Sequence, residues 1–153
     1  MFSQTAEYAL RVVVCLASSP EAPMTTRQIA RTTRIPEGYL AKVLQGLSRS
    51  GLLIARRGLH GGFALASSPE SLTVHQILSS VEPMPRITRC PLGLRSHGPD
   101  LCALHRRMDD ALATIEQVMR GTTVAEILRD ASPIKPMAER SDSSAAASPG
   151  KTN

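Results

Sequence analysis

Apolar side chains recur with helical spacing through the first 50 residues of the chain. Residues 5–17 carry them at i, i+3, i+4 and i+7, which predicts a helix with one buried face. Thr25, followed three residues later by Gln28, is typical of a capping box and predicts the start of a short second helix. Pro36 separates that helix from a third, which gathers its apolar residues on one side and ends before Gly51.

Two short apolar runs after the third predicted helix have the length of β-strands. Residues 52–55 and 63–66 flank residues 56–62, which hold three glycines and two arginines. A glycine-rich segment of this length closes a β-hairpin, because glycine accepts the backbone angles of tight turns. Two short helices followed by a hairpin predict a winged helix-turn-helix, a fold that meets DNA through its last helix and its hairpin, the wing.

The second half of the chain alternates helical signals with an irregular stretch. Thr73 and the glutamine three residues later form a second predicted capping box, which opens a helix running through Val81. Residues 83–101 are rich in Pro, Gly and Arg and lack a hydrophobic period, so they are predicted to be a loop. Residues 102–120 form a long predicted helix with one apolar stripe, and Thr123 is predicted to cap a final short helix.

The apolar stripe of the long helix needs a partner surface, and a winged-helix domain offers none that is large enough. We expect it to pack against the same helix of a second chain in a homodimer; the alternative is that it folds back on its own domain. The expected fold class is mainly α with a small β-hairpin, a winged helix-turn-helix plus a long C-terminal dimerisation helix. The expected parts are a DNA-binding domain over 1–82, a cysteine-containing sensor loop over 83–101, a dimerisation helix with a short terminal helix over 102–130, and a disordered tail over 131–153, where large apolar side chains are scarce.

The positive charge of the chain is concentrated near its N-terminus. The formal net charge is +5, and residues 1–60 hold eight basic and three acidic side chains, whereas ten of each lie in the remainder. A local basic excess of this kind favours a polyanion as partner. No apolar run is long enough to cross a membrane and no secretion signal is recognised at the start, so we expect a cytoplasmic protein that does not bind membranes.

The sequence offers no arrangement that is typical of an enzyme. It contains no phosphate-binding loop, no nucleophile with a neighbouring base and no paired carboxylates, so we expect no catalytic activity. The alternative binding function is a winged helix that contacts another protein in place of DNA.

The three cysteines fall into two groups. Cys15 lies among apolar residues of the first predicted helix and is expected to be a small core residue. Cys90 lies in the predicted loop and Cys102 at the start of the long helix, with His105 three residues further on. A cysteine and a histidine at i and i+3 reach one metal ion, and a helix N-terminus favours the thiolate that binds metals or reacts with oxidants. The spacing is not that of a zinc finger, so it leaves the identity of the metal open.

An ordered set of short motifs resembles one family of regulators. Its parts are Glu7-Tyr8-Ala9-Leu10-Arg11, Ile29-Ala30 with Ile35-Pro36, Tyr39-Leu40-Ala41-Lys42-Val43-Leu44-Gln45, Gly51-Leu52 and, as the strongest match, Arg57-Gly58-Leu59-His60-Gly61-Gly62-Phe63-Ala64-Leu65-Ala66. Over residues 3–130 the sequence resembles the Rrf-type winged-helix transcriptional regulators, the family that includes the IscR, NsrR and CymR proteins. The resemblance implies a homodimer that binds double-stranded DNA at palindromic operators and represses or activates nearby genes, with repression the role expected here.

The resemblance also implies which residues meet DNA. In the family the recognition helix enters the major groove and a wing arginine, which matches Arg57 here, enters the minor groove. The residues at base-reading positions are Gly38, Tyr39, Ala41 and Lys42. Lys42 is the expected direct reader, because Ala41 offers only a methyl group, which suits thymine. The expected phosphate contacts are Thr26, Arg27, Arg56 and His60.

Family members that bind an iron-sulfur cluster use three loop cysteines and one further ligand. The resemblance matches Cys90 and Cys102 to the first and third cysteine, but it places Ser96 at the middle position. Some relatives add a carboxylate from the first helix of the other subunit, which matches Glu7, and others add a histidine, which matches His105. The expected cofactor is therefore a 2Fe-2S cluster held by Cys90, Cys102 and two of Glu7, His97 and His105. The alternatives are a thiol-disulfide switch between the two cysteines, a mononuclear metal, and a loop that binds nothing.

Overall fold

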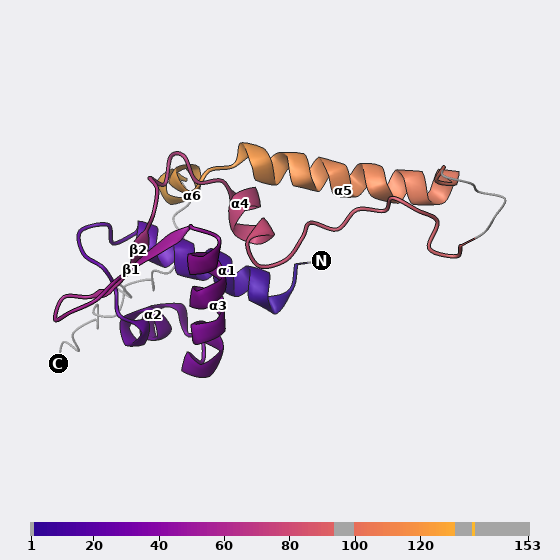
Figure 1. The fold of residues 1–153 in the computed structure, drawn as a ribbon. Coiled ribbons are helices and arrows are strands. Elements are labelled where there is room, and N and C mark those ends of the chain that lie inside the picture. Colours follow the sequence, from indigo (N-terminus) through magenta and orange to yellow (C-terminus); the bar gives the residue numbers. More distant parts are fainter. Residues whose placement is uncertain (1, 94–99, 131–135, 137–153) are drawn as a thin grey trace, which may run out of the picture.

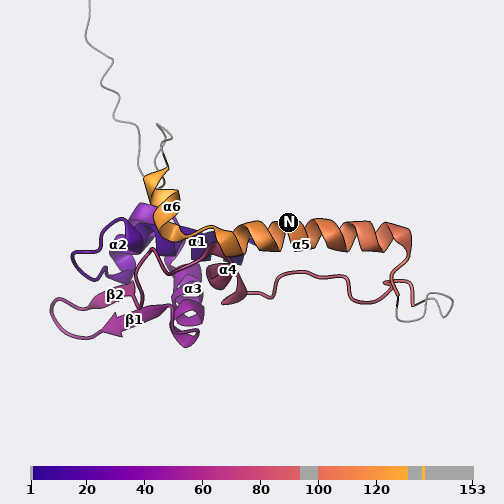
Figure 2. The same cartoon turned by 90° about the horizontal axis from the view of Figure 1, so that it is seen from above.

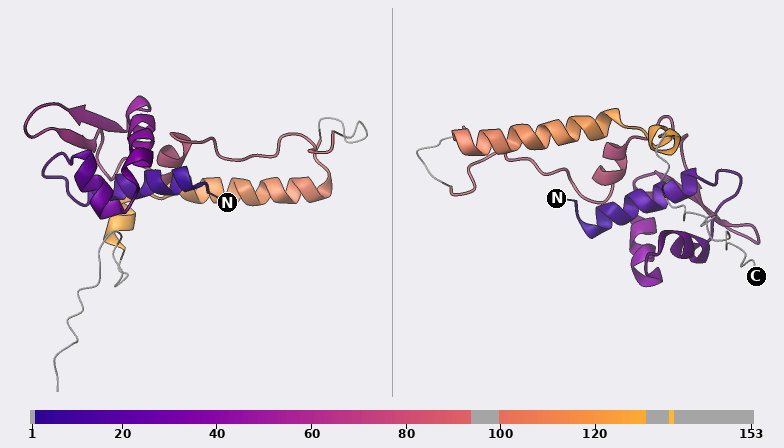
Figure 3. Two further views of the ribbon diagram at one scale, coloured as in Figure 1. Left: turned by 90° about the horizontal axis from the view of Figure 1, so that it is seen from below. Right: turned by 180° about the vertical axis from the view of Figure 1, so that it is seen from behind.

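The computed structural model describes residues 2–93, 100–130 and 136. Within them it contains the helices α1 (Gln4–Ala17), α2 (Thr26–Thr33), α3 (Glu37–Arg49), α4 (Val74–Ser79), α5 (Ala103–Gly121) and α6 (Val124–Arg129), and the strands β1 (Leu53–Arg56) and β2 (Gly62–Leu65). Figure 1 shows α5 projecting from a body made by the other elements, and α1 lies between α5 and the pair α2 and α3 (Figures 1 and 3). This is the predicted architecture, mainly α with one small hairpin. The predicted tail beyond residue 130 lies outside the described residues, apart from residue 136.

The helices begin where the sequence predicts them, because each start is fixed by residues within one turn. Thr25 accepts a hydrogen bond from the backbone N–H of Gln28, and the Gln28 side chain accepts one from the N–H of Thr25 at 2.8 Å, which completes the predicted capping box. Thr73 opens α4 in the same way, and Thr123 forms a box with Glu126 at the start of α6. These reciprocal bonds satisfy two N–H groups that have no partner inside the helix.

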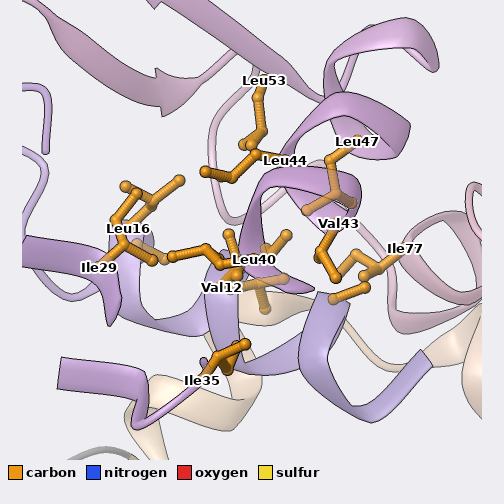
Figure 4. Close-up of a cluster of buried hydrophobic side chains, with 14 of the residues drawn as sticks. Val12, Leu16, Ile29, Ile35, Leu40, Val43, Leu44, Leu47, Leu53 and Ile77 are labelled. Carbon is orange, nitrogen blue, oxygen red and sulfur yellow. The ribbon is translucent and has the colours of Figure 1, made fainter. Parts of the chain in front are cut away.

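The core joins α1, α2, α3, α4 and the first strand (Figure 4). Its fully buried members include Val12, Ile29, Leu40, Leu47 and Ile77. The buried residues of α3 all lie on one side of the helix, so its opposite side is left for another role. Burial of a side chain of this size stabilises the fold by about 1.5–3 kcal/mol. The core therefore fixes the orientation of α3.

The hairpin is joined to the start of α2 as well as to α3. Strands β1 and β2 pair in antiparallel fashion, with Arg56 opposite Gly62. Beyond this pair, Phe63 and Met24 exchange two backbone hydrogen bonds, of 2.8 and 2.9 Å. Gly62 allows this approach, since a Cβ on it would lie 2.5 Å from the carbonyl oxygen of Met24 and its φ is +153°. Only glycine fits here.

Helix α4 is shorter than predicted. The sequence pattern predicts a helix that continues through Val81, but α4 ends at Ser79. The hydroxyl of Ser80 donates to the carbonyl of Ile77 at 2.6 Å, and the N–H of Val81 bonds to Leu78, three residues back. The regular helix therefore ends two residues before Val81, the last residue of the predicted apolar pattern.

Helix α5 touches the body only near its C-terminal end. Met119 packs against Ala6, Val74 and Leu78, and the backbone N–H of Val74 donates to Thr122 just beyond the helix. No residue of α5 is fully buried. Residues 82–93, which we call the strap, contain no helix or strand and run along α5 (Figures 1 and 2).

A cluster of ion pairs clamps the strap to α5. Arg86 donates two hydrogen bonds to the carboxylate of Asp109, at 2.6 and 2.8 Å, and the backbone N–H of Ile87 donates a third at 2.8 Å. These bonds lower the pKa of Asp109 to about 2, with the Arg86 guanidinium as the main cause. Glu116 lies next to them, within 3.6 Å of Arg86 and 3.3 Å of His75 on α4. Its pKa is lowered, chiefly by a hydrogen bond from Arg120.

No helix in the part of the chain that the structure describes combines the length and the hydropathy needed to cross a membrane.

The ion pair between Arg86 and Asp109, which we call the clamp, predicts how Asp109 titrates. Replacing Arg86 with alanine removes the main cause of the lowered pKa, so the midpoint should rise from about 2 toward 3.8, the ordinary value. NMR detection of the Asp109 carboxyl carbon during an acid titration measures it. Because the folded-state pKa is lowered, the clamp contributes stability above the ordinary pKa and loses it as the pH falls toward 2. Arg107→Ala removes an equal charge from the exposed side of α5 and should leave the midpoint near 2; an unchanged midpoint in Arg86→Ala contradicts the clamp.

Candidate nucleic-acid interface

The outer side of α3 faces the start of α2 and the wing across a shallow hollow. Its lining comes from three elements and consists of Thr26, Ala41, Lys42, Leu44, Gln45 and Phe63. Three of the residues predicted from the sequence, Thr26, Ala41 and Lys42, are thus brought together on one surface. Gln45 and Phe63 are missing from that prediction. Gln45 lies one helical turn after Ala41, so helical spacing alone points to it, whereas Phe63 joins only because β2 pairs with Met24.

The basic side chains of this region are exposed and unpaired. Arg27, Lys42, Arg56 and Arg57 are exposed. Over the described residues none of these four makes an ion pair or a side-chain hydrogen bond, in contrast to Arg11, Arg86 and Arg120. Their charges are therefore available to an external anion. A basic surface without internal partners is the electrostatic feature expected of a protein that binds nucleic acid.

The wing ends in a tight turn. The N–H of Gly61 donates to the carbonyl of Gly58 at 3.0 Å, which encloses Leu59 and His60. A Cβ on Gly61 would lie 2.4 Å from the carbonyl oxygen of Arg56, so the turn has little room to change shape. Arg57 and His60 are both exposed at this tip.

The other predicted DNA-contact residues do not line this hollow, and two of them have surroundings of their own. Arg56 lines a second hollow, formed by the hairpin and the loop after α1, together with Ser19, Pro20 and Ala22. Gly38 is exposed at the start of α3, and a Cβ on it would meet no atom within 4 Å. The structure therefore groups Lys42 with Ala41 and Thr26 and places Arg56 at a second hollow, which shares Phe63 with the first.

Tyr39 is half-buried and directed toward α1. Its hydroxyl forms a 2.6 Å hydrogen bond with the hydroxyl of Thr5, and its ring meets that of Tyr8 edge to face, with centroids 5.4 Å apart. These contacts attach the first turn of α3 to α1. Among the predicted base-reading residues, Tyr39 is the one whose polar group already has a partner inside the chain.

The cysteine region contains one close pair of possible ligands. Cys102 is the N-cap residue of α5, and its Sγ lies 3.3 Å from Nδ1 of His105. Both side chains are half-buried, as is Cys90 in the strap. The pair confirms that the i, i+3 spacing places sulfur and ring nitrogen side by side. Ser96 and His97 lie outside the described residues.

The remaining predicted ligand, Glu7, lies elsewhere in the chain. Its carboxylate accepts a 2.6 Å hydrogen bond from Arg11, which also donates to the carbonyl of Thr33. Within residues 2–93 and 100–130, no three His, Cys, Asp or Glu side chains gather in a way that would hold a metal ion. A single subunit therefore brings Cys102 and His105 together but leaves Glu7 apart from them.

Cys15 is a core residue, as predicted. It is buried in α1, and its Sγ lies 3.8 Å from the sulfur of Met24. Burial raises the pKa of its thiol, which disfavours the reactive thiolate. We therefore separate Cys15 from the two cysteines of the strap and α5.

One side of α5 is apolar and exposed. Its residues, which we call the apolar seam, are Leu104, Met108, Ala111, Ile115 and Val118. They follow one another at intervals of four, three, four and three residues, the heptad spacing of helices that pair with one another. The half-buried residues Asp109, Leu112 and Glu116 lie on the adjacent side, toward the strap and body. The seam therefore lies on a different side of α5 from the ion pairs that hold the strap.

Known sequences of similar length include helix-turn-helix regulators. A protein of Aquifex aeolicus (strain VF5) described as an HTH-type transcriptional regulator is 28% identical over 131 residues, which span 84% of this chain and 91% of that protein. A second protein with this description, from Synechocystis sp. (strain ATCC 27184 / PCC 6803 / Kazusa), is 37% identical over 84 residues, which span 52% of this chain and 57% of that protein.

Solved structures share the fold. IscR of T. potens superposes with a TM-score of 0.72 at 25% identity, covering 86% of this chain and 88% of that one. CymR, the global cysteine regulator of B. subtilis, superposes with a TM-score of 0.70 at 23% identity, covering 83% of this chain and 95% of that one. These relatives and neighbours are transcriptional regulators and not enzymes.

The family model for Rrf2, described as an iron-dependent transcriptional regulator, matches residues 2–130. The match includes the wing, the recognition helix α3 and the long helix α5, so it spans every element described above. The chain belongs to the Rrf2 family of DNA-binding transcriptional regulators.

Proposed function

We propose that this Rrf2-family regulator acts as a homodimer that binds a palindromic operator and represses the adjacent genes. The observation that carries the proposal is the surface made by α3, the start of α2 and the wing, where Lys42 lines the hollow and Arg27 and Arg57 are exposed without a partner in the described part of the chain. Repression follows from position, since a dimer bound near a promoter excludes other proteins from the same DNA.

Helix α3 is proposed to read bases in the major groove. Lys42 and Gln45 line the hollow and end in groups that hydrogen-bond base edges, and Ala41 offers a methyl group to thymine. Thr26 and Arg27, at the start of α2, are proposed to contact phosphates on the edge of the same groove. Tyr39 is proposed to hold α3 at the correct angle through Thr5, because its hydroxyl is already engaged.

The wing is proposed to place Arg57 in the adjacent minor groove. Its side chain is exposed and has no partner in the described part of the chain, so DNA binding costs no internal ion pair. The backbone turn at Gly61 fixes the tip from which it projects. Arginine suits this groove because a narrow minor groove concentrates negative potential.

Replacing Arg57 or Lys42 with alanine should weaken DNA binding by about ten- to a hundredfold, because each removes an unpaired charge from the interface. The measurement is fluorescence anisotropy with duplexes that the wild-type chain selects from randomised DNA, at several salt concentrations. The slope of log affinity against log salt should fall by about 1 for either variant if the residue neutralises a phosphate. Lys42→Ala should also relax the base preference at one position in each half-site.

Arg107→Ala is the matched control, since it removes the same charge from the exposed side of α5. It should leave affinity and salt slope at their wild-type values. If the wild-type chain shows no salt-dependent and sequence-preferring binding, the surface serves a protein contact and the operator-binding proposal is wrong.

The homodimer is proposed to form through the apolar seam of α5. The seam is exposed in the single chain, and its heptad spacing matches that of helices which pair along their length. Water would otherwise cover all five of its side chains, at a cost that pairing removes. Because α5 is joined to the body at α4 and α6, pairing two copies fixes the separation of the two α3 helices. A palindromic operator needs that separation to match about one turn of DNA, roughly 34 Å.

Ile115→Glu should convert the dimer into a monomer. A charge in the middle of the seam has no partner there, and burying it costs about 3 kcal/mol or more, which raises the dimer Kd at least roughly a hundredfold. Sedimentation velocity at several protein concentrations measures the change. Gln117→Glu adds the same charge to an exposed position of the same helix and should stay dimeric. A dimeric Ile115→Glu protein would show that another surface pairs the subunits.

The strap and the start of α5 are proposed to hold an iron-sulfur cluster that tunes DNA affinity. Cys102 and His105 fit such a role, since their donor atoms lie 3.3 Å apart, and Cys90 lies on the strap that the clamp attaches to α5. The candidates for the remaining ligand position are His97 and Glu7, and Glu7 would come from the partner subunit. Bound there, the cluster would supply a redox-sensitive centre. The family description as iron-dependent supports an iron site over a thiol switch.

Protein purified and reconstituted without air should be coloured and contain iron and sulfide, as measured by its visible spectrum and by chemical analysis. Cys90→Ser and Cys102→Ser should each lose most of the iron, because each removes a thiolate ligand. Cys15→Ala is the control and should retain it, since Cys15 is buried in the core. A colourless, iron-free wild-type protein excludes the cluster; a difference in DNA affinity between its oxidised and reduced forms would then favour the thiol switch.

A further inference from the structure

The tip of the wing carries the most exposed large apolar side chain among the described residues. Leu59 is 95% exposed, compared with 73% for Leu92 in the strap. It lies between Arg57 and His60, whose side chains are polar and also exposed. No apolar neighbour covers it, so the folded chain gains nothing from its hydrophobic surface.

The turn itself does not explain this leucine. Leu59 and His60 are the two central residues of the turn that the Gly61 N–H closes onto the carbonyl of Gly58. Such positions favour Gly, Pro, Asn, Asp or Ser, which have suitable backbone angles or short polar side chains. Leucine brings none of these advantages. Its apolar side chain is therefore better explained by a contact that forms outside the chain.

The turn also prevents Leu59 from moving back onto the body. A Cβ on Gly61 would collide with the backbone of Arg56, so the two sides of the tip are already in close contact. On the other side, Phe63 and Met24 join the base of the hairpin to α2. The wing therefore holds Leu59 forward as the leading side chain of the tip.

We infer that Leu59 presses into the minor groove beside Arg57 and makes the wing sensitive to the base pairs beneath it. The inference rests on the proposed function and adds a specificity-determining residue to it. The basic neighbours Arg56 and Arg57 complement DNA phosphates, which favours DNA over an apolar protein surface. Apolar side chains that enter the minor groove contact sugars and base edges there and widen or kink the duplex. The exocyclic amino group of guanine projects into this groove, so Leu59 should favour A·T pairs at the wing position.

The test compares base pairs that differ only in one groove. In a duplex selected by the wild-type chain, each A·T pair beneath the wing is replaced by G·C or by inosine·C. Both replacements change the major groove alike, but only G·C adds the minor-groove amino group. Wild-type protein should bind the inosine duplex about fivefold more tightly than the G·C duplex. Leu59→Ala should lose about fivefold in affinity for the inosine duplex and little for the G·C duplex, so that it hardly discriminates between them.

Two further variants complete the design. Leu59→Met keeps an apolar side chain of similar size and should retain the discrimination, whereas a purely structural role for the turn would not distinguish it from alanine. Leu92→Ala removes the other highly exposed leucine, which lies on the strap, and should behave as the wild type. Wild-type discrimination in Leu59→Ala overturns the inference and leaves the proposed operator binding intact. A wild-type chain without specific DNA binding overturns both, and a Leu59→Ala effect on protein partners alone would assign the tip to a protein contact.

Discussion

The pairing of Met24 with Phe63 is the contact on which the nucleic-acid surface depends. Its two backbone hydrogen bonds join the segment before α2 to the second strand of the wing. The core meanwhile fixes α3 against α1 and α2. Because both attachments meet at α2, α3 and the wing form one unit and are held at a fixed distance from each other. In the proposed complex, two grooves of one duplex are contacted together only if that spacing is fixed, and Gly62, with no room for a side chain, lies at the junction that fixes it.

Helix α5 carries the ion pairs with the strap on one side and the apolar seam on the adjacent side. Residues at successive positions of a helix point about 100° apart, so Met108 and Asp109, or Ile115 and Glu116, belong to different sides. The charged side binds the strap through Arg86 and reaches α4 through His75. The apolar side stays largely exposed in the single chain, with Leu104 65% and Val118 57% exposed. A second copy can therefore pair along the seam without disturbing the ion pairs that hold the strap.

Local features of this fold can be predicted from the sequence, whereas contacts between distant residues cannot. The capping boxes at Thr25 and Thr73 depend on residues three positions apart, and the Cys102 and His105 pair depends on the same spacing. The partner of Tyr39 lies 34 positions away and that of Arg86 lies 23 positions away. No period in the sequence encodes either pair, because both arise only after helices have packed. For the same reason the sequence assigns Arg56 and Lys42 to one DNA-contact surface, yet they line different hollows.

The strap is attached at two points, one on the body and one on α5. At its start, the carboxylate of Glu82 accepts a 3.2 Å hydrogen bond from the backbone N–H of Ser3, the N-cap of α1. Four residues before Cys90, Arg86 is held by Asp109. In the proposed mechanism a change of ligation or oxidation at Cys90 therefore acts on a segment whose movement is restricted by its attachments at Glu82 and Arg86. The displacement would reach α1, which packs against α3, and α5, which sets the distance to the second subunit. A shift of either helix alters the fit to both half-sites at once.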